Sequence, residues 1–351
     1  MKIDLRNISL VAGVNLLVFA GLFLGLEAGL RLWQCESFAC NRGEIFIRYY
    51  PGEGHGQLHA GFIPDSELGW RLNPDFKPPT LDSPGFFWGQ DYRVNREGFR
   101  NTEDFADAAR EAGPPRIMLL GDSFVFGSGI RQSATLARIL ERRLDGRFRV
   151  YSAGVSGWGI DQMLLAYQKY APILRPEIVF LVFIDDDFQR ALHAFRADAG
   201  ARPMLRVSGG ELKRETRQGP PLLERIARRS LVLNRLYLNL WIYPEERRLH
   251  RAIFSELIRR TQADGRRLLV MRYPEYEHLW AGGRRHRHDY SAFFRERSIL
   301  YYDPFPEIKN LGMHIYYDFY QKDSHPTRLG NEMIGEYLML SGFPQASRKI
   351  L

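Results

Sequence analysis

Residues 116–127 read RIMLLGDSFVFG, and this stretch decides the fold. Arg116–Leu120 is a short apolar run that ends at Gly121, which is typical of a buried parallel strand. Ser123 follows the run almost at once. Because sites in open α/β sheets form at the carboxyl ends of strands, the sequence predicts that Ser123 stands at such a site. A Gly-Asp-Ser turn is also a common cap or turn without catalytic function.

Four more apolar runs follow the first, and helical patterns separate them. Strands that alternate with helices predict βαβ crossovers and a mainly parallel five-stranded sheet covered on both faces, which is a three-layer α/β sandwich. The further predicted strands are Val150–Val155, Ile178–Ile184, Leu268–Tyr273 and Ile299–Tyr302, and the predicted helices are Leu136–Leu144, Asp161–Tyr170 (closing before Pro172), Arg251–Gln262 and Asn331–Leu340.

The sequence divides into a loop-rich lead-in segment at 29–110 and a main domain at 111–345 with an insertion at about 190–250. Within the lead-in, Arg93–Arg100 is predicted to form a short strand and turn that cover the main domain. Within the insertion, Leu222–Tyr243 reads as an amphipathic helix. Such a helix lies either at a membrane surface or on the domain with its arginines in solvent, and we expect the second.

The N-terminus carries a candidate membrane anchor. Residues 8–26 (ISLVAGVNLLVFAGLFLGL) contain one strongly polar side chain, Asn15, and 19 helical residues span about 28 Å, close to one bilayer core. Residues 8–28 are therefore expected to be a single-pass transmembrane helix behind a short cytoplasmic tail at 1–7, with the main domain on the periplasmic or extracellular side. A cleaved signal peptide and a buried core helix are the alternatives.

The cysteines and the charge pattern bear on the compartment and the partners of the protein. Cys35 and Cys40 are expected to form a small disulfide loop beyond the membrane, or else to remain two thiols. The net charge is +8, and residues 201–300 hold 22 Lys and Arg against 11 Asp and Glu. This basic segment suits anionic headgroups, an acidic polysaccharide or nucleic acid, or is simply a solvated face. Nucleic-acid-binding motifs are not apparent, and we expect no such partner.

A serine nucleophile needs a base, and one candidate stands near the C-terminus. Residues 323–331 read DSHPTRLGN and precede a predicted helix. Asp323 and His325 lie two residues apart, so the carboxylate can orient one imidazole nitrogen while the other faces the nucleophile. The alternative is a polar loop with an ordinary histidine.

Together, GDSFxxG at 121–127 and DxHPxxxGN at 323–331 resemble the first and last sequence blocks of the SGNH (GDSL-type) hydrolase family, whose fold is flavodoxin-like. Residues 152–159 (SAGVSGWG) resemble its second block, and 178–187 (IVFLVFIDDD) its third, over roughly 115–340 in the same order. The lead-in is similar to that of membrane-tethered members. The resemblance implies a Ser123–His325–Asp323 triad, with the amides of Ser123 and Gly157 binding the oxyanion.

One position departs from the family pattern. Where members usually carry an asparagine that donates to the oxyanion, this chain has Asp186. An ionised carboxylate would repel the oxyanion, and the loss of one donor typically costs on the order of 10²–10³ in rate. Other chemistry has less support: arginines flank His286 and His288, so we expect no metal, and no cofactor motif is present.

The sequence therefore predicts a membrane-anchored serine esterase or acyltransferase. Its substrate is expected to be an O-acyl ester of an envelope glycan or lipid. The alternative is a non-catalytic protein on the same fold that binds envelope glycan or a partner, and Asp186 is the feature that favours it.

Overall fold

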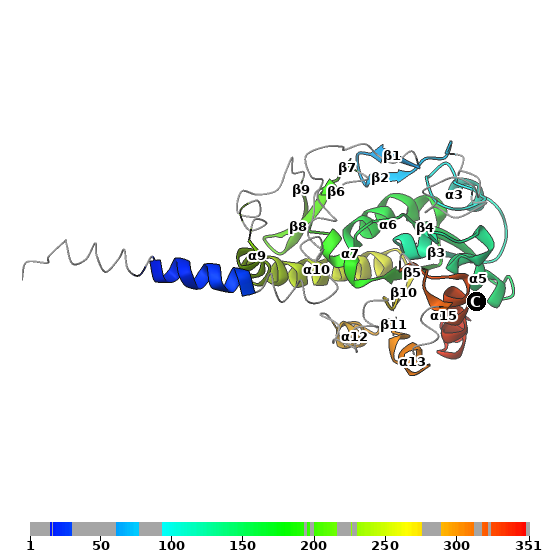
Figure 1. Cartoon of the computed structure of the whole chain (residues 1–351). Coiled ribbons are helices and arrows are strands. Elements are labelled where there is room, and N and C mark those ends of the chain that lie inside the picture. The colour runs from blue at the N-terminus through cyan, green and yellow to red at the C-terminus, as the bar shows by residue number, and fades with distance from the viewer. Residues whose placement is uncertain are drawn as a thin grey trace, which may run out of the picture.

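The structure, a computed structural model, describes residues 15, 17–29, 61–76, 93–192, 195–196, 200–215, 226, 230–275, 289–311, 318–321 and 324–348. Five parallel strands form its central sheet in the order β11-β10-β5-β3-β4 (Figure 1). The strands are β3 (Arg116–Gly121), β4 (Arg149–Gly154), β5 (Ile178–Phe183), β10 (Arg267–Arg272) and β11 (Leu300–Tyr302). The predicted five-stranded parallel sheet is confirmed, and each strand lies within a residue or so of its predicted bounds.

Both faces of the sheet are buried, and alternate residues of one strand pack into separate cores. In β5, Val179 and Leu181 point into one core, while Ile178 and Phe180 point into the other. A strand buried on both sides needs apolar residues throughout, which is why β5 is a continuous apolar run rather than an alternating one.

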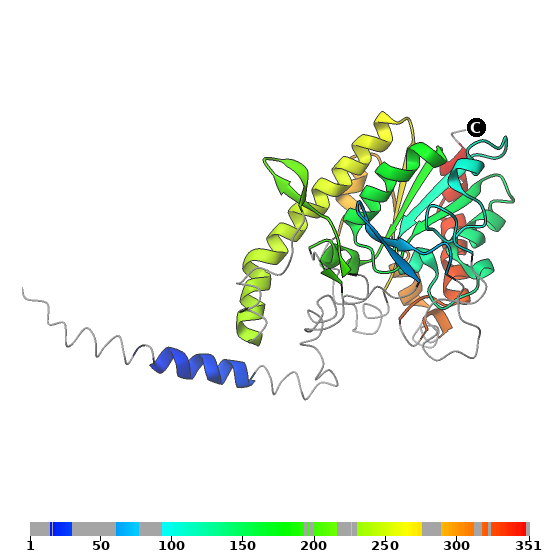
Figure 2. The same cartoon turned by 90° about the horizontal axis from the view of Figure 1, so that it is seen from above.

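Helices cover each face (Figure 2). On one side lie α6 (Ile160–Leu174) and α10 (Tyr243–Ala263), together with α3 (Phe105–Ala108), α7 (Asp185–Arg190) and α12 (Ser291–Arg295); on the other lie α5 (Leu136–Arg143) and α15 (Arg328–Leu340), with α13 (Phe305–Asn310) and α16 (Phe343–Arg348). The short elements α4 (Ser123–Phe126) and η1 (Gln132–Ala134) connect β3 to α5. The result is the predicted three-layer arrangement.

The prediction that the helix after β4 closes before Pro172 is wrong. Pro172 lies inside α6, which continues to Leu174 and ends where Arg175 adopts a left-handed conformation. Proline removes one intrahelical hydrogen bond. Ala171 and Leu174, both fully buried, continue to pack in the core, and their burial offsets that loss.

The insertion contains two small hairpins and a helical arm. The hairpins are β6 (Phe195–Arg196) with β7 (Gly200–Ala201), and β8 (Met204–Ser208) with β9 (Glu211–Glu215). The arm comprises α9 (Leu231–Tyr237) and the π-helical turn η2 (Leu238–Ile242), which run directly into α10. Leu236, Leu240 and Trp241 are exposed on it. Our expectation of a helix with its apolar side packed on the domain is therefore wrong for this part of the arm.

The lead-in segment packs against the edge of the sheet. Strands β1 (Phe62–Asp65) and β2 (Gly69–Leu72) form an antiparallel hairpin. Residues 93–100 form turns and bends rather than the predicted strand, because the Asn95 side chain accepts from the Phe99 amide and closes a turn. At the outer edge of β4, the side chain of Asn101 donates to the Ser152 carbonyl (2.8 Å) and accepts from the Ser152 amide (2.9 Å).

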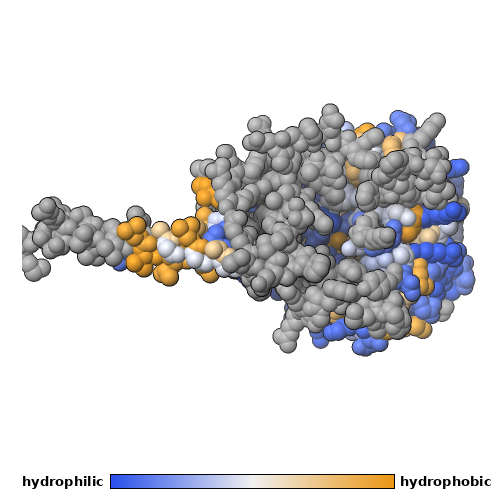
Figure 3. Space-filling view, in the orientation of Figure 1, coloured by the Kyte–Doolittle hydropathy of each residue, from blue (hydrophilic) through white to orange (hydrophobic). Residues whose placement is uncertain are grey.

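Residues 17–29 form the N-terminal helix, with the large apolar side chains Leu17, Phe19, Leu22 and Leu24 exposed (Figure 3). Among the described residues, no helix combines the length and the hydropathy needed to cross a membrane. Residues 8–14 of the candidate anchor, and Cys35 and Cys40, lie outside the described residues.

Candidate active site

Ser123 is the first residue of α4, directly beyond the carboxyl end of β3. Asp122 caps this one-turn helix, since its Oδ1 accepts from the Phe124 amide at 2.9 Å. The turn requires its glycine: a Cβ on Gly121 would lie 2.3 Å from Cγ2 of Val125. Val125 also fills the space that a Cβ on Gly154 in β4 would occupy, at 2.6 Å from its Cγ1. The two glycines therefore let α4 sit tightly on the ends of two strands.

The hydroxyl of Ser123 is nearly buried and donates to Oδ2 of Asp122 at 3.2 Å. The same oxygen accepts from Nη1 of Arg190 at 2.6 Å. Arg190 Nη1 also lies 2.6 Å from Oδ1 of Asp187 and 3.3 Å from the Trp158 carbonyl. The proposed nucleophile thus belongs to a network of two buried carboxylates and one guanidinium, whose single positive charge can neutralise one of the two carboxylate charges.

Asp187 shows how strongly burial acts in this network. Its side chain is fully buried, and its Oδ2 accepts from the Ile184 amide at 2.9 Å. Burial, with a further contribution from the nearby Asp122, raises the pKa of Asp187 well above its usual range. Arg190 opposes that rise. The guanidinium thus favours the ionised form of Asp187, whereas burial and Asp122 favour its protonated form.

Asp186, at the position of the missing asparagine, lies in the first turn of α7. Its side chain is 47% exposed, and its Oδ2 lies 3.7 Å from Nη2 of Arg190. Glu275, beyond the end of β10, accepts from the Asp185 amide at 2.9 Å. Burial and the neighbouring Asp186 and Asp185 raise the pKa of Glu275 well above its usual range. The carboxyl edge of the sheet is therefore crowded with acids, and Arg190 and Arg272 compensate them.

His325, from the C-terminal part of the chain, packs against α4. Its ring centroid lies 5.6 Å from that of Phe124, the residue after Ser123. The His325 carbonyl accepts from the Gln321 amide at 2.7 Å, and Gln321 Nε2 donates to the carbonyls of Ser128 and Pro326, both at 2.8 Å. These bonds tie the histidine segment to the turn that follows α4. Asp323 lies outside the described residues.

The remaining residues of the HPTRLGN stretch shape the start of α15. Thr327 caps the helix by accepting from the Gly330 amide at 3.1 Å. A Cβ on Gly330 would lie 2.5 Å from the Phe319 carbonyl. Asn331 is fully buried; it accepts from the Tyr273 hydroxyl (2.9 Å) and donates to the Ala134 carbonyl (3.1 Å). These residues fix the position of the histidine segment relative to β10 and η1.

The loop after β4 carries Gly157, the proposed oxyanion donor. Gly157 has φ +78°, a conformation that favours glycine. The lead-in hairpin holds this loop: Trp70 Nε1 donates to the Ser156 carbonyl at 3.2 Å, and Trp158 Nε1 donates to the Trp70 carbonyl at 3.1 Å. Gln162 Nε2 adds a bond to the Leu68 carbonyl at 2.6 Å. The lead-in therefore supports the site as well as covering the core.

Sequence reasoning missed two arginines. Arg190 follows Asp186 and Asp187 at helical i+4 and i+3 spacing, a signal that was available. No sequence signal pointed to Arg100, which comes from the lead-in and is buried. Its guanidinium donates to the carbonyls of Phe126, Gly127 and Ile130 and to the Gln132 side chain, all at 2.7–3.0 Å. It thereby fixes the loop that follows α4.

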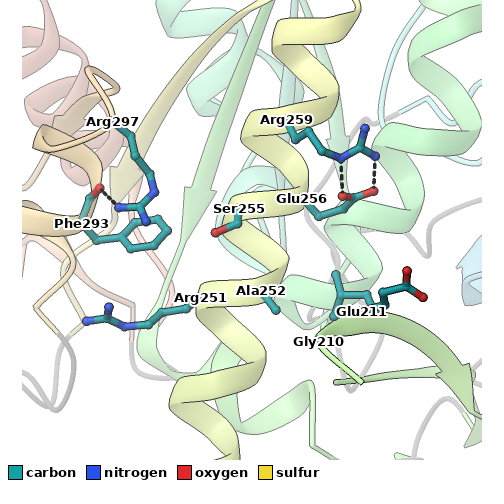
Figure 4. A pocket seen from close by; sticks show the side chains of 10 residues that line it. Gly210, Glu211, Arg251, Ala252, Ser255, Glu256, Arg259, Phe293 and Arg297 are labelled. Atoms are coloured by element: carbon teal, nitrogen blue, oxygen red, sulfur yellow. Dashed lines mark hydrogen bonds and ion pairs between the residues drawn. The ribbon is translucent and has the colours of Figure 1, made fainter. Parts of the chain in front are cut away.

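A cavity of about 690 Å³ opens elsewhere, beside α10 between the β8–β9 turn and α12 (Figure 4). Neither Ser123 nor His325 lines it. Its arginines are largely engaged, as Arg259 forms two 2.8 Å bonds with Glu256 and Arg297 stacks 3.8 Å above the Phe293 ring. Among the described residues, no group of three or more His, Cys, Asp or Glu could hold a metal ion. His286 and His288 lie outside them.

No family profile and no curated protein sequence matches this chain. Solved structures do align with it. A GDSL-like lipase from Bacteroides thetaiotaomicron shares 13% identity over 70% of this chain and 100% of its own, with a TM-score of 0.38. A lipase/acylhydrolase from Enterococcus faecalis shares 12% over 67% and 96% (TM-score 0.39). A psychrotrophic esterase from Pseudoalteromonas shares 14% over 64% and 94% (TM-score 0.37). Both the identities and the TM-scores of these alignments are low.

Proposed function

We propose that this protein is a serine esterase or acyltransferase that acts on O-acyl esters, with Ser123 as nucleophile, His325 as general base and Asp323 as the group that orients His325. The observation that carries the proposal is the packing of the His325 segment against α4, which begins with Ser123. Ser123 follows a central strand, where sites of open α/β sheets form, and the ring of His325, from the far end of the chain, packs on the next residue, Phe124.

In the proposed reaction, the Ser123 hydroxyl turns from Asp122 to His325, which takes its proton as Oγ attacks the ester carbonyl carbon. The carbonyl oxygen becomes an oxyanion, held by the amides of Ser123 and Gly157. When the tetrahedral intermediate collapses, the ester C–O bond breaks and His325 gives its proton to the leaving alcohol. Water, or a sugar hydroxyl in the transferase case, then attacks the acyl-enzyme with His325 again as base.

We further propose that the protein is anchored through residues 8–28, with its main domain on the non-cytoplasmic side and an acylated envelope glycan or lipid as substrate. Support comes from the apolar run at 8–26 and from the exposed apolar side chains of the N-terminal helix. The basic surplus of residues 201–300 favours an anionic surface nearby.

The second candidate is a non-catalytic glycan- or partner-binding protein. Two observations favour it: the Ser123 hydroxyl bonds to a carboxylate, and a second carboxylate, Asp186, stands where a donor is usual. A carboxylate beside a nucleophile opposes the developing negative charge unless a cation offsets it.

Active-site labelling separates the two candidates. The full chain, purified in detergent, is treated with a fluorophosphonate probe beside Ser123→Ala, His325→Ala and the matched surface control Ser133→Ala. The enzyme proposal expects labelling of the wild type and of Ser133→Ala, and its loss in the other two variants. A folded wild type that takes up no probe would contradict the enzyme proposal and favour the binding-protein candidate.

A further inference from the structure

Three exposed apolar residues on the helical arm form what we call the docking face: Leu236, Leu240 and Trp241, which are 50–60% exposed. Large apolar side chains gathered on one element and left in solvent mark an interaction surface rather than ordinary surface composition. Val232 and Tyr237 on the same side of the arm are buried, and the Tyr237 ring stacks on that of Trp241 with 6.1 Å between centroids. Arg235 and Asn239 lie on the other side and are exposed, so the arm is amphipathic.

The arm is attached to the N-terminal helix. Glu27 is 9% exposed, and its Oε2 accepts from the Ser230 hydroxyl at 2.8 Å and from the Val232 amide at 3.0 Å. Ser230 Oγ in turn accepts from the Leu233 amide at 3.2 Å. Glu27 thus helps to cap α9, where a negative charge also suits the positive end of the helix dipole. The start of α9 is fixed at the domain-side end of the N-terminal helix.

From this junction α9 runs across the axis of the N-terminal helix rather than along it, and the folded domain lies on the far side of α9 (Figure 1; Figure 2). The N-terminal helix also exposes large apolar residues, including Leu22 at 69% and Leu26 at 55%. The apolar N-terminal helix thus meets the amphipathic helix α9, which crosses it at its domain-side end. This is the arrangement in which one helix enters a bilayer and the other lies in its surface.

The charges near the docking face suit anionic lipid. Arg235 is exposed directly before Leu236, and Arg247 and Arg248 are exposed in the second turn of α10. Glu245, the nearby exposed acid, is engaged by Arg206. Arginines that border apolar and aromatic residues are the composition of helices that bind at the headgroup boundary.

We propose that α9 and η2 form an interfacial membrane-docking element, whose docking face inserts among the lipids of the leaflet through which the N-terminal helix passes. It fixes the orientation of the main domain on the membrane by a second contact, besides the anchor. The inference extends the proposed anchor and does not depend on catalysis.

Site-specific photocrosslinking of the full chain tests the inference. A benzophenone amino acid replaces Leu240, and the protein is reconstituted in nanodiscs of phosphatidylcholine and phosphatidylglycerol that carry a traceable lipid. The same substitution at Leu22 reports on the proposed anchor. Leu340, at the end of α15, is the matched control, because it is 79% exposed and thus more open than Leu240.

Lipid adducts at 240 and 22, with none at 340, are the expected result. Adducts at 22 without adducts at 240 would overturn the docking element and leave the anchor standing. Adducts at 240 without any at 22 would support the element and remove the anchor. Crosslinks from 240 to a second copy, or to residues 30–60 of the same chain, would replace lipid as the occupant. Fluorophosphonate labelling of the same samples follows the proposed enzyme activity separately.

Discussion

Arg190 Nη1 lies 2.6 Å from Oδ2 of Asp122, the residue directly before the proposed nucleophile, and the same nitrogen lies 2.6 Å from Asp187. One cation thus compensates two carboxylates that are almost completely buried. Its Nη2 lies nearest to Asp186, the acid at the asparagine position. Arg190 is therefore the cation that partly offsets the negative charge of Asp186, which stands where the family pattern has asparagine.

Arg190→Gln should destabilise the protein by roughly 3–5 kcal/mol, because it leaves buried carboxylates without their cation. Adding Asp187→Asn should recover part of that loss. Urea unfolding measures both effects. Arg96→Gln is the control: its guanidinium pairs with Asp104 and Asp107 but is 78% exposed, so a much smaller loss of stability is expected. Equal losses for Arg190→Gln and Arg96→Gln would contradict the role assigned to Arg190.

Asp186→Asn should speed fluorophosphonate labelling by as much as about 10²–10³, since it supplies the side-chain donor that the oxyanion lacks. Asp186→Ala separates the two possible causes, because it removes the negative charge without adding a donor. A labelling rate that rises much more in Asp186→Asn than in Asp186→Ala supports a hydrogen-bond donor at this position. Unchanged or slower labelling in Asp186→Asn would show that residue 186 does not face the oxyanion.

Glu275→Gln should stabilise the protein near neutral pH. The pKa of Glu275 is raised in the folded state, mainly by burial, so the folded protein holds this proton more tightly than the unfolded chain does. Such a group lowers stability as pH rises from its unfolded pKa, about 4.3, through its higher folded pKa. The side-chain carbonyl oxygen of glutamine can still accept the hydrogen bond from the backbone N–H of Asp185. Thermal unfolding from pH 3.5 to 8 should show the advantage of Gln growing with pH, and a constant difference would refute this.

Arg100→Met should cost about 3 kcal/mol or more, since three buried carbonyls of the loop after α4 lose a charged donor. The labelling rate at Ser123 should fall as well, because that loop also binds the His325 segment through Ser128 and Gln321. Arg110→Met, an exposed lead-in arginine paired with Asp107, is the control for both readouts. Normal labelling by a destabilised Arg100→Met would restrict Arg100 to a role in folding.

The strands were predictable because burial on both faces demands unbroken apolar runs, as in β5. Helix ends were harder to predict. The first two turns of α10, from Tyr243, are mostly polar in sequence, yet Glu246, Leu249 and His250 are buried there by tertiary packing. Pro172 is tolerated inside α6 because Leu174 packs in the core. Local patterns singled out Ser123 and His325, and the family resemblance added Gly157. The hydrogen bonds of Arg100 to carbonyls 26–30 residues away depend on tertiary structure and left no such signal. The exposure of Leu240 and Trp241 could not be predicted either, because a helical spacing of apolar residues is the same whether they face a protein core or a bilayer.

The side chain of Asn101 has a consequence beyond the site. Its amide group satisfies both the N–H and the C=O of Ser152 on β4, the last strand on that side of the sheet. An open sheet edge invites another chain to pair with it and so begins aggregation. At Ser152 this side chain takes the place of a neighbouring strand, as Glu141 and Arg138 do at Val150. Removing the lead-in to obtain a smaller protein would expose the Ser152 part of that edge and favour self-association.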